Sequence, residues 1–224
     1  MTDAKERTEI DVRMFTVGPL QENCFVVRAR DASSAIVVDP GDEPEKLLAA
    51  IGRLGIETVE AILVTHTHFD HIGAVAPLAR ATNAVVYCPQ LERQVLANIM
   101  DYVPWPGFGP FESYEADQTV AGGETLELAD LTFEVLFTPG HSPGHVTYAL
   151  REEGAMFSGD VLFQGSVGRV DLPGGDWATL LSSIDSLLQA FPEETAVYPG
   201  HMGITTLARE RATNPFLREL AKNP

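Results

Sequence analysis

Six histidines, confined to three short segments, are the residues of this 224-residue sequence best suited to chemistry. The segments read THTHFDH, TPGHSPGH and YPGH, and each follows an apolar, strand-like run. Their histidines are His66, His68, His71, His141, His145 and His201. Imidazoles gathered at strand ends, with aspartates close by, are typical ligands of divalent metal ions. The sequence therefore predicts a metal site built from loops at the end of a sheet.

The first segment offers two neighbouring metal positions. His66 and His68 are two residues apart in an extended stretch, so both imidazoles face the same way and can bind one ion. Asp70 and His71 lie where we expect the chain to turn into a helix, which directs them to a second position nearby.

Later segments supply the groups that can complete both positions. His141 and His201 each follow a strand and a turn, and each can join one position. Asp160, in the segment SGD, ends another strand and brings a carboxylate that can bridge two cations. We therefore expect two adjacent ions rather than one.

Strands and helices that position these segments are mixed along the whole chain. Apolar patterns predict strands over 12–17, 24–28, 35–39, 59–65, 84–88, 125–128, 132–137, 145–150, 155–158 and 196–198. Helices are predicted over 44–54, 70–80, 91–100 and 176–190 and in the tail from Thr205, with Asp42 and Glu45 spaced as a capping box. This mixture favours an α/β fold with helices flanking sheets.

Composition and charge exclude several classes of function. The sequence has 15 Lys and Arg against 32 Asp and Glu, a net charge of -17, and no basic cluster, which argues against a nucleic-acid partner. No apolar run is long enough for a membrane span, and the polar start is unlike a signal peptide. Cys24 and Cys88 lack metal-binding spacing, so we expect buried free thiols and a cytoplasmic protein.

The order of four motifs resembles the metallo-β-lactamase superfamily. The motifs are HxHxDH, the downstream PGH, the SGD aspartate and the final GH, and the match runs from Asp39 in VVDPG to His201. The resemblance implies a single domain over residues 1–224. Its fold would be an αββα sandwich, in which two mixed sheets are flanked by helices.

The resemblance also implies a ligand set for two divalent metal ions. Zinc is the first expectation, and iron or manganese would also suit these ligands. One ion would be held by His66, His68 and His141, the other by Asp70, His71 and His201, and Asp160 would bridge them. His145 matches no metal position and is expected to be structural, and Asp39 is expected to support the site from below.

Within the superfamily, the sequence is most similar to short proteins of the glyoxalase II type. The stretches GSVGRVDLPGGD (165–176) and TTLARERATNPFL (205–217) carry this similarity. It implies a binuclear hydrolase that uses a metal-bound hydroxide to cleave a small-molecule thioester, S-lactoylglutathione or a related acylglutathione. Asp70 is the expected catalytic side chain, since it can also orient the hydroxide. Only 23 residues (224 − 201) follow His201, so we expect the helical domain that holds glutathione in ordinary glyoxalase II to be absent.

Three points stay open on the sequence alone. A persulfide dioxygenase is the alternative, with one iron held by His66, His141 and Asp160. Arg169 is either an anion contact or, as we favour, the ion-pair partner of Asp171. The aromatic loop over 102–114 either covers the core or forms an apolar wall beside the site.

Overall fold

The N-terminal half forms a mixed six-stranded sheet in the computed structural model, which describes residues 8–218. Its strands lie in chain order: β1 (Ile10–Val17), β2 (Glu22–Ala29), β3 (Ser34–Val38), β4 (Thr58–Leu63), β5 (Val85–Pro89) and β6 (Gln118–Val120). The first three strands pair antiparallel, and β3 to β6 pair parallel. The parallel strands therefore all end at one edge, where the loops that follow them meet.

The C-terminal half forms a second six-stranded sheet, in the order β14-β13-β10-β9-β8-β7. Its strands are β7 (Thr125–Leu128), β8 (Leu131–Phe137), β9 (Val146–Leu150), β10 (Ala155–Gly159), β13 (Ala196–Pro199) and β14 (Thr205–Thr206). Strands β10 and β13 pair parallel, so the loops after them leave the sheet at the same edge. A two-stranded ribbon, β11 (Leu162–Phe163) with β12 (Ser166–Val167), follows β10.

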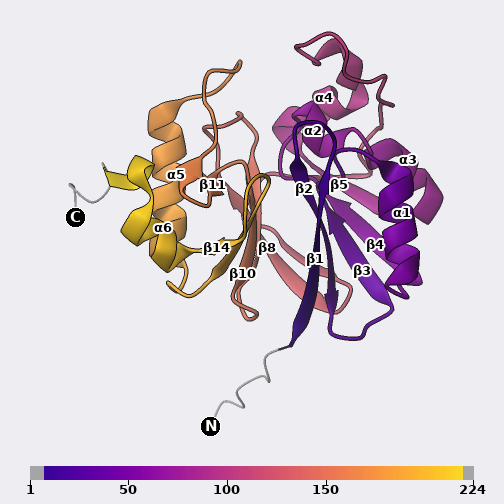
Figure 1. The fold of residues 1–224 in the computed structure, drawn as a ribbon, viewed down its shortest axis with the longest axis horizontal. Helices are drawn as coiled ribbons and strands as arrows, with labels where there is room; N and C mark the ends of the chain where they lie inside the picture. The colour runs from indigo at the N-terminus through magenta and orange to yellow at the C-terminus, as the bar shows by residue number, and fades with distance from the viewer. Residues whose placement is uncertain (1–7, 219–224) are drawn as a thin grey trace.

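Helices cover the outer faces of the two sheets (Figure 1). On the N-terminal sheet these are α1 (Pro44–Arg53) and α3 (Val75–Thr82), and on the C-terminal sheet α5 (Trp177–Ala190) and α6 (Leu207–Thr213). The remaining helical segments are α2 (Phe69–Ile72), η1 (Gln90–Glu92), α4 (Arg93–Ala97), η2 (Ile99–Asp101) and η3 (Pro215–Arg218). The predicted αββα sandwich of two mixed sheets flanked by helices is confirmed.

Three apolar layers fill the sandwich, and alternation along the strands assigns each side chain to a layer. On β2, Cys24 and Val26 face the helices α1 and α3, while Phe25 and Val27 face the second sheet. The layer between the sheets also contains the fully buried Tyr148. Because both faces of the inner strands are buried, these strands read as continuous apolar runs in the sequence.

Two predicted helices differ from the structure in ways that matter for the site. The helix expected over 70–80 is broken between α2 and α3, where the Ala74 N–H donates to Pro40 O rather than within a helix. A Cβ on Gly73 would lie 2.4 Å from the carbonyl oxygen of Gly41, so the close approach of these two turns requires glycine. The helix expected over 91–100 is likewise divided into η1, α4 and η2.

The predicted capping box at the start of α1 is wrong. Glu43 is the N-cap residue, with a left-handed backbone (φ 52°), and no side chain caps the helix. Asp42 instead accepts a hydrogen bond from the adjacent Glu43 N–H. Within residues 8–218, no helix is both long and apolar enough to cross a membrane.

Candidate metal centre

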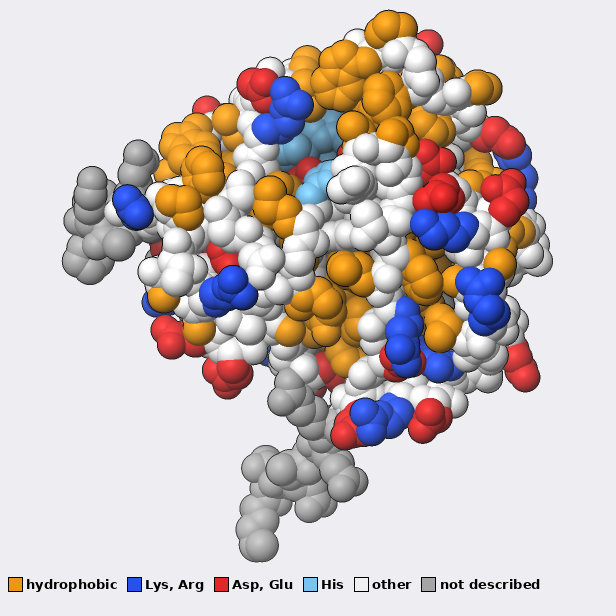
Figure 2. Space-filling model, viewed as in Figure 1, with side chains coloured by type: hydrophobic (Ala, Val, Ile, Leu, Met, Phe, Trp, Pro, Cys, Tyr) orange, Lys and Arg blue, Asp and Glu red, His pale blue; other side chains and the backbone are white. Residues whose placement is uncertain are grey.

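All seven predicted ligands lie at one edge of the sandwich, on segments that follow strands. The N-terminal sheet contributes the segment between β4 and α3, and the C-terminal sheet contributes the segments after β8, β10 and β13. The residues, in the same order, are His66, His68, Asp70, His71, His141, Asp160 and His201. In the space-filling view, histidine side chains lie at the bottom of a hollow bordered by hydrophobic atoms and one basic side chain (Figure 2).

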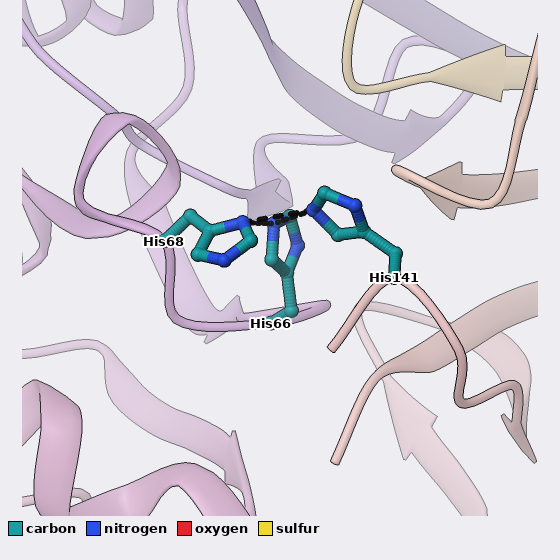
Figure 3. Close-up of side chains that lie close together, drawn as sticks. All are labelled: His66, His68 and His141. Atoms are coloured by element: carbon teal, nitrogen blue, oxygen red, sulfur yellow. Dashed lines mark hydrogen bonds between the residues drawn. The ribbon is translucent and has the colours of Figure 1, made fainter. Parts of the chain in front are cut away.

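Three imidazoles converge at the first position (Figure 3). His66 Nε2 lies 3.1 Å from His68 Nδ1, and His141 Nε2 lies 3.2 Å from His66 Nε2 and 2.8 Å from His68 Nδ1. Nitrogen ligands about 2.05 Å from a tetrahedral ion would be about 3.3 Å apart. The spacing of the three nitrogens therefore matches three corners of a metal tetrahedron.

Hydrogen bonds on the outer side of these rings determine which nitrogens have free lone pairs. The His141 Nδ1–H donates to the carbonyl oxygen of Arg169 at 2.7 Å. Thr65 Oγ1 donates to Asp39 Oδ2, so it accepts from His66 Nδ1–H at 3.1 Å. Both Nε2 atoms then present lone pairs to each other, and the single Nδ1 proton of His68 can satisfy only one of them. A cation at this point resolves the repulsion.

Burial keeps His66 and His68 in the form that binds metals. His66 is fully buried, and desolvation, with the neighbouring histidines, lowers its pKa well below the usual range. Desolvation and the neighbouring His141 lower the pKa of His68 to about 4. Neutral imidazoles are the ligand form at physiological pH, so His66 and His68 need no deprotonation to receive an ion.

Asp70, His71 and His201 form the second group. His201 Nε2 lies 3.4 Å from Asp70 Oδ2. His71 Nδ1 lies 3.0 Å from Asp39 Oδ2, and its buried Nε2 has no hydrogen-bond partner among the described residues. Burial opposes a positive charge on His71 and His201, but nearby carboxylates outweigh it and raise the pKa of both. The second position thus attracts positive charge.

Asp160 lies between the two groups. Its Oδ2 is 3.5 Å from His141 Nε2 and 3.6 Å from His201 Nε2, and its Oδ1 is 3.4 Å from His71 Nε2. Burial raises the pKa of the Asp160 carboxyl, but the surrounding histidines lower this pKa by more than burial raises it. Asp160 is therefore ionised. Its buried Oδ1 lacks a hydrogen-bond partner in the described part of the chain.

Gly200 allows the last ligand segment to approach Asp160 closely. A Cβ on Gly200 would lie 2.3 Å from Asp160 Oδ1 and 2.6 Å from His71 Cε1. The glycine of the final GH motif is therefore required by the close packing of the second group. The donors and their unpaired buried atoms suit two divalent ions.

Two further residues support the ligands from behind, as the sequence indicated for both. Asp39 accepts from the Thr65 N–H at 2.7 Å and from Thr65 Oγ1 at 2.6 Å, as well as facing His71. His145 belongs to neither group of ligands: its Nε2 accepts the Asp160 N–H at 3.1 Å and its Nδ1 faces Thr138 Oγ1 at 3.0 Å. These contacts fix the orientation of the ligand segments.

The aromatic loop over 102–114 packs partly against the core and partly against the segment that carries the first ligands. Phe108 and Phe111 pack against the core, whereas Trp105 is 38% exposed and lies against Phe69, which directly follows ligand His68. Across from this loop, the Arg169 guanidinium lies 6.0 Å from the centre of the Trp105 ring.

Arg169 also makes the ion pair that the sequence favoured. Its Nε donates to Asp171 Oδ1 at 2.6 Å. The Arg169 side chain therefore lies near Trp105, and Asp171 largely compensates its charge.

Sequence reasoning missed Glu92, which is buried behind the first group and hydrogen-bonded to the segments on both sides of it. A single glutamate in a predicted helix normally faces solvent, so no sequence signal distinguished it. Its partners are found only in the folded chain.

Two known proteins are similar to this chain over most of its length. The chain is 40% identical over 210 residues to YqgX of Bacillus subtilis, described as a probable metallo-hydrolase, covering 92% of this chain and 96% of that protein. It is 32% identical over 210 residues to the hydroxyacylglutathione hydrolase GloC of Haemophilus influenzae, covering 93% of this chain and 98% of that protein.

Solved structures show the same fold. BLEG-1, a B3 metallo-β-lactamase, superposes with a TM-score of 0.86 at 40% identity, covering 92% of this chain and 99% of that one. TTHA1623, solved in a di-iron-bound form, gives a TM-score of 0.74 at 44% identity, covering 92% and 100%. The metallo-beta-lactamase superfamily model matches residues 17–201, which include all seven predicted ligands. The chain therefore belongs to the metallo-β-lactamase superfamily.

Proposed function

We propose that the seven side chains hold two divalent cations and that the protein is a binuclear hydrolase. His66, His68 and His141 would hold the first ion, Asp70, His71 and His201 the second, with Asp160 between them. The position of Asp160 carries the proposal. One ionised carboxylate faces histidines of both groups, 3.5 Å from His141 and 3.6 Å from His201, as a bridging ligand must.

The chemistry follows from the charge of this ligand set. When bound, two divalent ions supply Lewis acidity and lower the pKa of a coordinated water from about 16 toward 7. Five neutral imidazoles and the carboxylates of Asp70 and Asp160 cannot cancel the charge of two dications, so the site favours a reacting group that gains negative charge. A tetrahedral oxyanion, formed in acyl transfer, is such a group.

Chain residues give this site its geometry. The Arg169 carbonyl holds the ring of His141, and His145 holds the backbone of Asp160. Asp70 Oδ2 lies 3.4 Å from His201 Nε2 and can orient a nucleophile as well as bind an ion. Trp105 packs against Phe69, which follows ligand His68 in the chain, and so offers an apolar surface beside this segment.

For the substrate we propose a small thioester, S-lactoylglutathione or a related acylglutathione. The similarity to the hydroxyacylglutathione hydrolase GloC supports this choice. So does the exposed Trp105, which offers an apolar contact to an acyl chain or thiol carrier beside the ions. Arg169, whose guanidinium lies 6.0 Å from the centre of the Trp105 ring, is available to a substrate carboxylate that displaces Asp171.

A persulfide dioxygenase with one iron is the second candidate. His66, His141 and Asp160 provide two imidazoles and one carboxylate: His141 Nε2 is 3.2 Å from His66 Nε2 and 3.5 Å from Asp160 Oδ2. Two histidines and one carboxylate are the usual ligands of non-haem iron oxygenases. In that case the second group would stay empty in the active enzyme.

One side-by-side assay distinguishes these functions. Purified protein is given S-lactoylglutathione, glutathione persulfide under oxygen, and a chromogenic β-lactam, while thiol release, oxygen uptake and ring opening are recorded. We expect thiol release from the thioester, no oxygen uptake, and about two metal ions per chain by elemental analysis. Oxygen uptake with one iron per chain would establish the dioxygenase, and ring opening alone would refute the thioesterase.

A further inference from the structure

Glu92, at the end of η1, is a buried carboxylate with four hydrogen bonds. Its side chain is 5% exposed although no basic group neutralises it among the contacts described for residues 8–218. Oε2 accepts from the Thr67 N–H at 2.7 Å and from Thr67 Oγ1 at 2.9 Å. Oε1 accepts from the Gly144 N–H at 2.7 Å and from Ser142 Oγ at 2.5 Å. Such a carboxylate is stabilised by its donors alone.

Each oxygen of this carboxylate binds a different ligand segment. Thr67 lies between the ligands His66 and His68, on the segment after β4 of the N-terminal sheet. Ser142 follows the ligand His141, on the segment between β8 and β9 of the C-terminal sheet. Glu92 therefore links the two halves of the three-histidine group through one planar carboxylate group.

Packing leaves little freedom for this link to change length. A Cβ on Gly144 would lie 2.7 Å from Glu92 Cγ, so glycine is needed for the close approach of the second segment. In the arrangement held this way, the three ligand nitrogens lie within 3.2 Å of one another. A shift of a few tenths of an ångström between the segments would change that spacing directly.

We propose that Glu92 is a positioning residue that sets the spacing of His66, His68 and His141, and with it the affinity and coordination geometry of the first metal position. The inference rests on the proposed two-metal function, because it assigns these histidines to one ion. Glu92 itself does not bind the ion: it acts through Thr67 and Ser142. Residues of this kind typically change metal affinity about 10–100-fold when replaced.

Glutamine cannot replace this carboxylate, although it has the same shape. Each carboxylate oxygen accepts from a backbone N–H, Thr67 on one side and Gly144 on the other. A backbone N–H can only donate, so whichever position the amide NH2 takes, it faces a donor. Glu92→Gln must therefore release one of the two ligand segments.

Glu60 provides a matched control. It also joins the two halves of the chain, accepting from Ser34 Oγ at 2.5 Å and from the Ala129 N–H at 2.7 Å. It lies on β4 before the strand reaches the metal edge, and none of its partners is near a predicted ligand. Glu60→Gln thus tests what the loss of a cross-linking carboxylate does to the fold alone.

The test is a titration of metal-free protein with Co²⁺, followed by its visible absorption bands, together with Zn²⁺ affinity against a competing chelator. For Glu92→Gln we expect altered absorption bands for the ion at the first position and about 10–100-fold weaker binding of that ion. Binding at the second position should stay close to wild type. Glu60→Gln should be destabilised toward urea and yet give wild-type bands and affinity.

Ser142→Ala keeps the test valid if Glu92→Gln does not fold. It removes one of the four bonds and should weaken the first equivalent in the same direction by a smaller factor. Wild-type bands and affinity in Glu92→Gln, or equal weakening by Glu60→Gln, would overturn the positioning role while leaving the two-metal site intact. A wild-type protein that binds no Co²⁺ would refute both proposals.

Discussion

Replacing Asp39 with asparagine should weaken the second metal position. Asp39 Oδ2 accepts from His71 Nδ1–H at 3.0 Å, so His71 Nε2 is the atom that faces the site and would bind an ion. An amide NH2 at this point would donate to Nδ1 instead, and the proton would move to Nε2, where it blocks coordination. The backbone of Asp39 is left-handed (φ 47°), a conformation that asparagine adopts readily, so the change affects the hydrogen bond rather than the turn.

The expected size of the effect comes from this one contact. Loss of a partner that fixes a metal-binding histidine costs about 10–100-fold in affinity, or about 1.4–2.7 kcal/mol. The fold should lose about 1.5–3 kcal/mol of unfolding free energy, because a charge-assisted bond to a buried group is removed. The second loss is tolerable for a domain of ordinary stability.

Calorimetric titration of metal-free protein with Zn²⁺ measures both equivalents in one experiment. In Asp39→Asn, the ion at the second position should bind more weakly by the stated factor. Asp117→Asn is the control: Asp117 also accepts a backbone N–H, from Val86 at 2.9 Å, but lies far from the ligands in the chain. An unchanged second equivalent in Asp39→Asn would refute the assignment of the His71 tautomer.

Three shorter predictions concern Asp160, Trp105 and the two cysteines. Asp160→Ala should abolish hydrolysis and lower the metal content by elemental analysis, since both groups face this carboxylate; retained activity would refute the ligand scheme. Trp105→Ala should raise KM about 5–30-fold with little change in kcat, because it removes about 1–2 kcal/mol of apolar contact with substrate; a fall in kcat alone would contradict this role. Cys24 and Cys88 should resist thiol reagents in the folded protein, since burial raises the pKa of both. Folding favours their neutral form, so the unfolding free energy is full below about pH 8.5 and falls above it by up to about 1.4 kcal/mol per pH unit for each thiol; urea titrations at pH 8 and 10 that agreed would contradict this.

Residue types and spacing were enough to predict the groups that meet at the site. His66 and His68 alternate in an extended segment, and the strand-end positions of His141, Asp160 and His201 placed them at one edge. The buried strands were recognisable because two-sided burial makes them continuously apolar. These features depend on local sequence, and the structure reproduces them.

Features that depend on distant partners were not predictable. The break after α2 comes from the approach of Gly73 to Gly41, two turns that are separate in the sequence. Glu92 owes its burial to donors 25 and 50 residues away. Trp105 and Phe111 belong to one aromatic loop, yet Trp105 is partly exposed to solvent and Phe111 packs against the core. Pattern alone does not separate such roles.

The order of the ligands along the chain determines when the site can form during synthesis. A growing chain that has folded its N-terminal sheet already holds His66, His68, Asp70 and His71, but neither of the two proposed ligand groups is complete. The first group is completed only with His141, and the second only with His201, after β13 has joined the other sheet. Tight capture of metal therefore waits for both sheets to pack, and the bound ions would then oppose their separation.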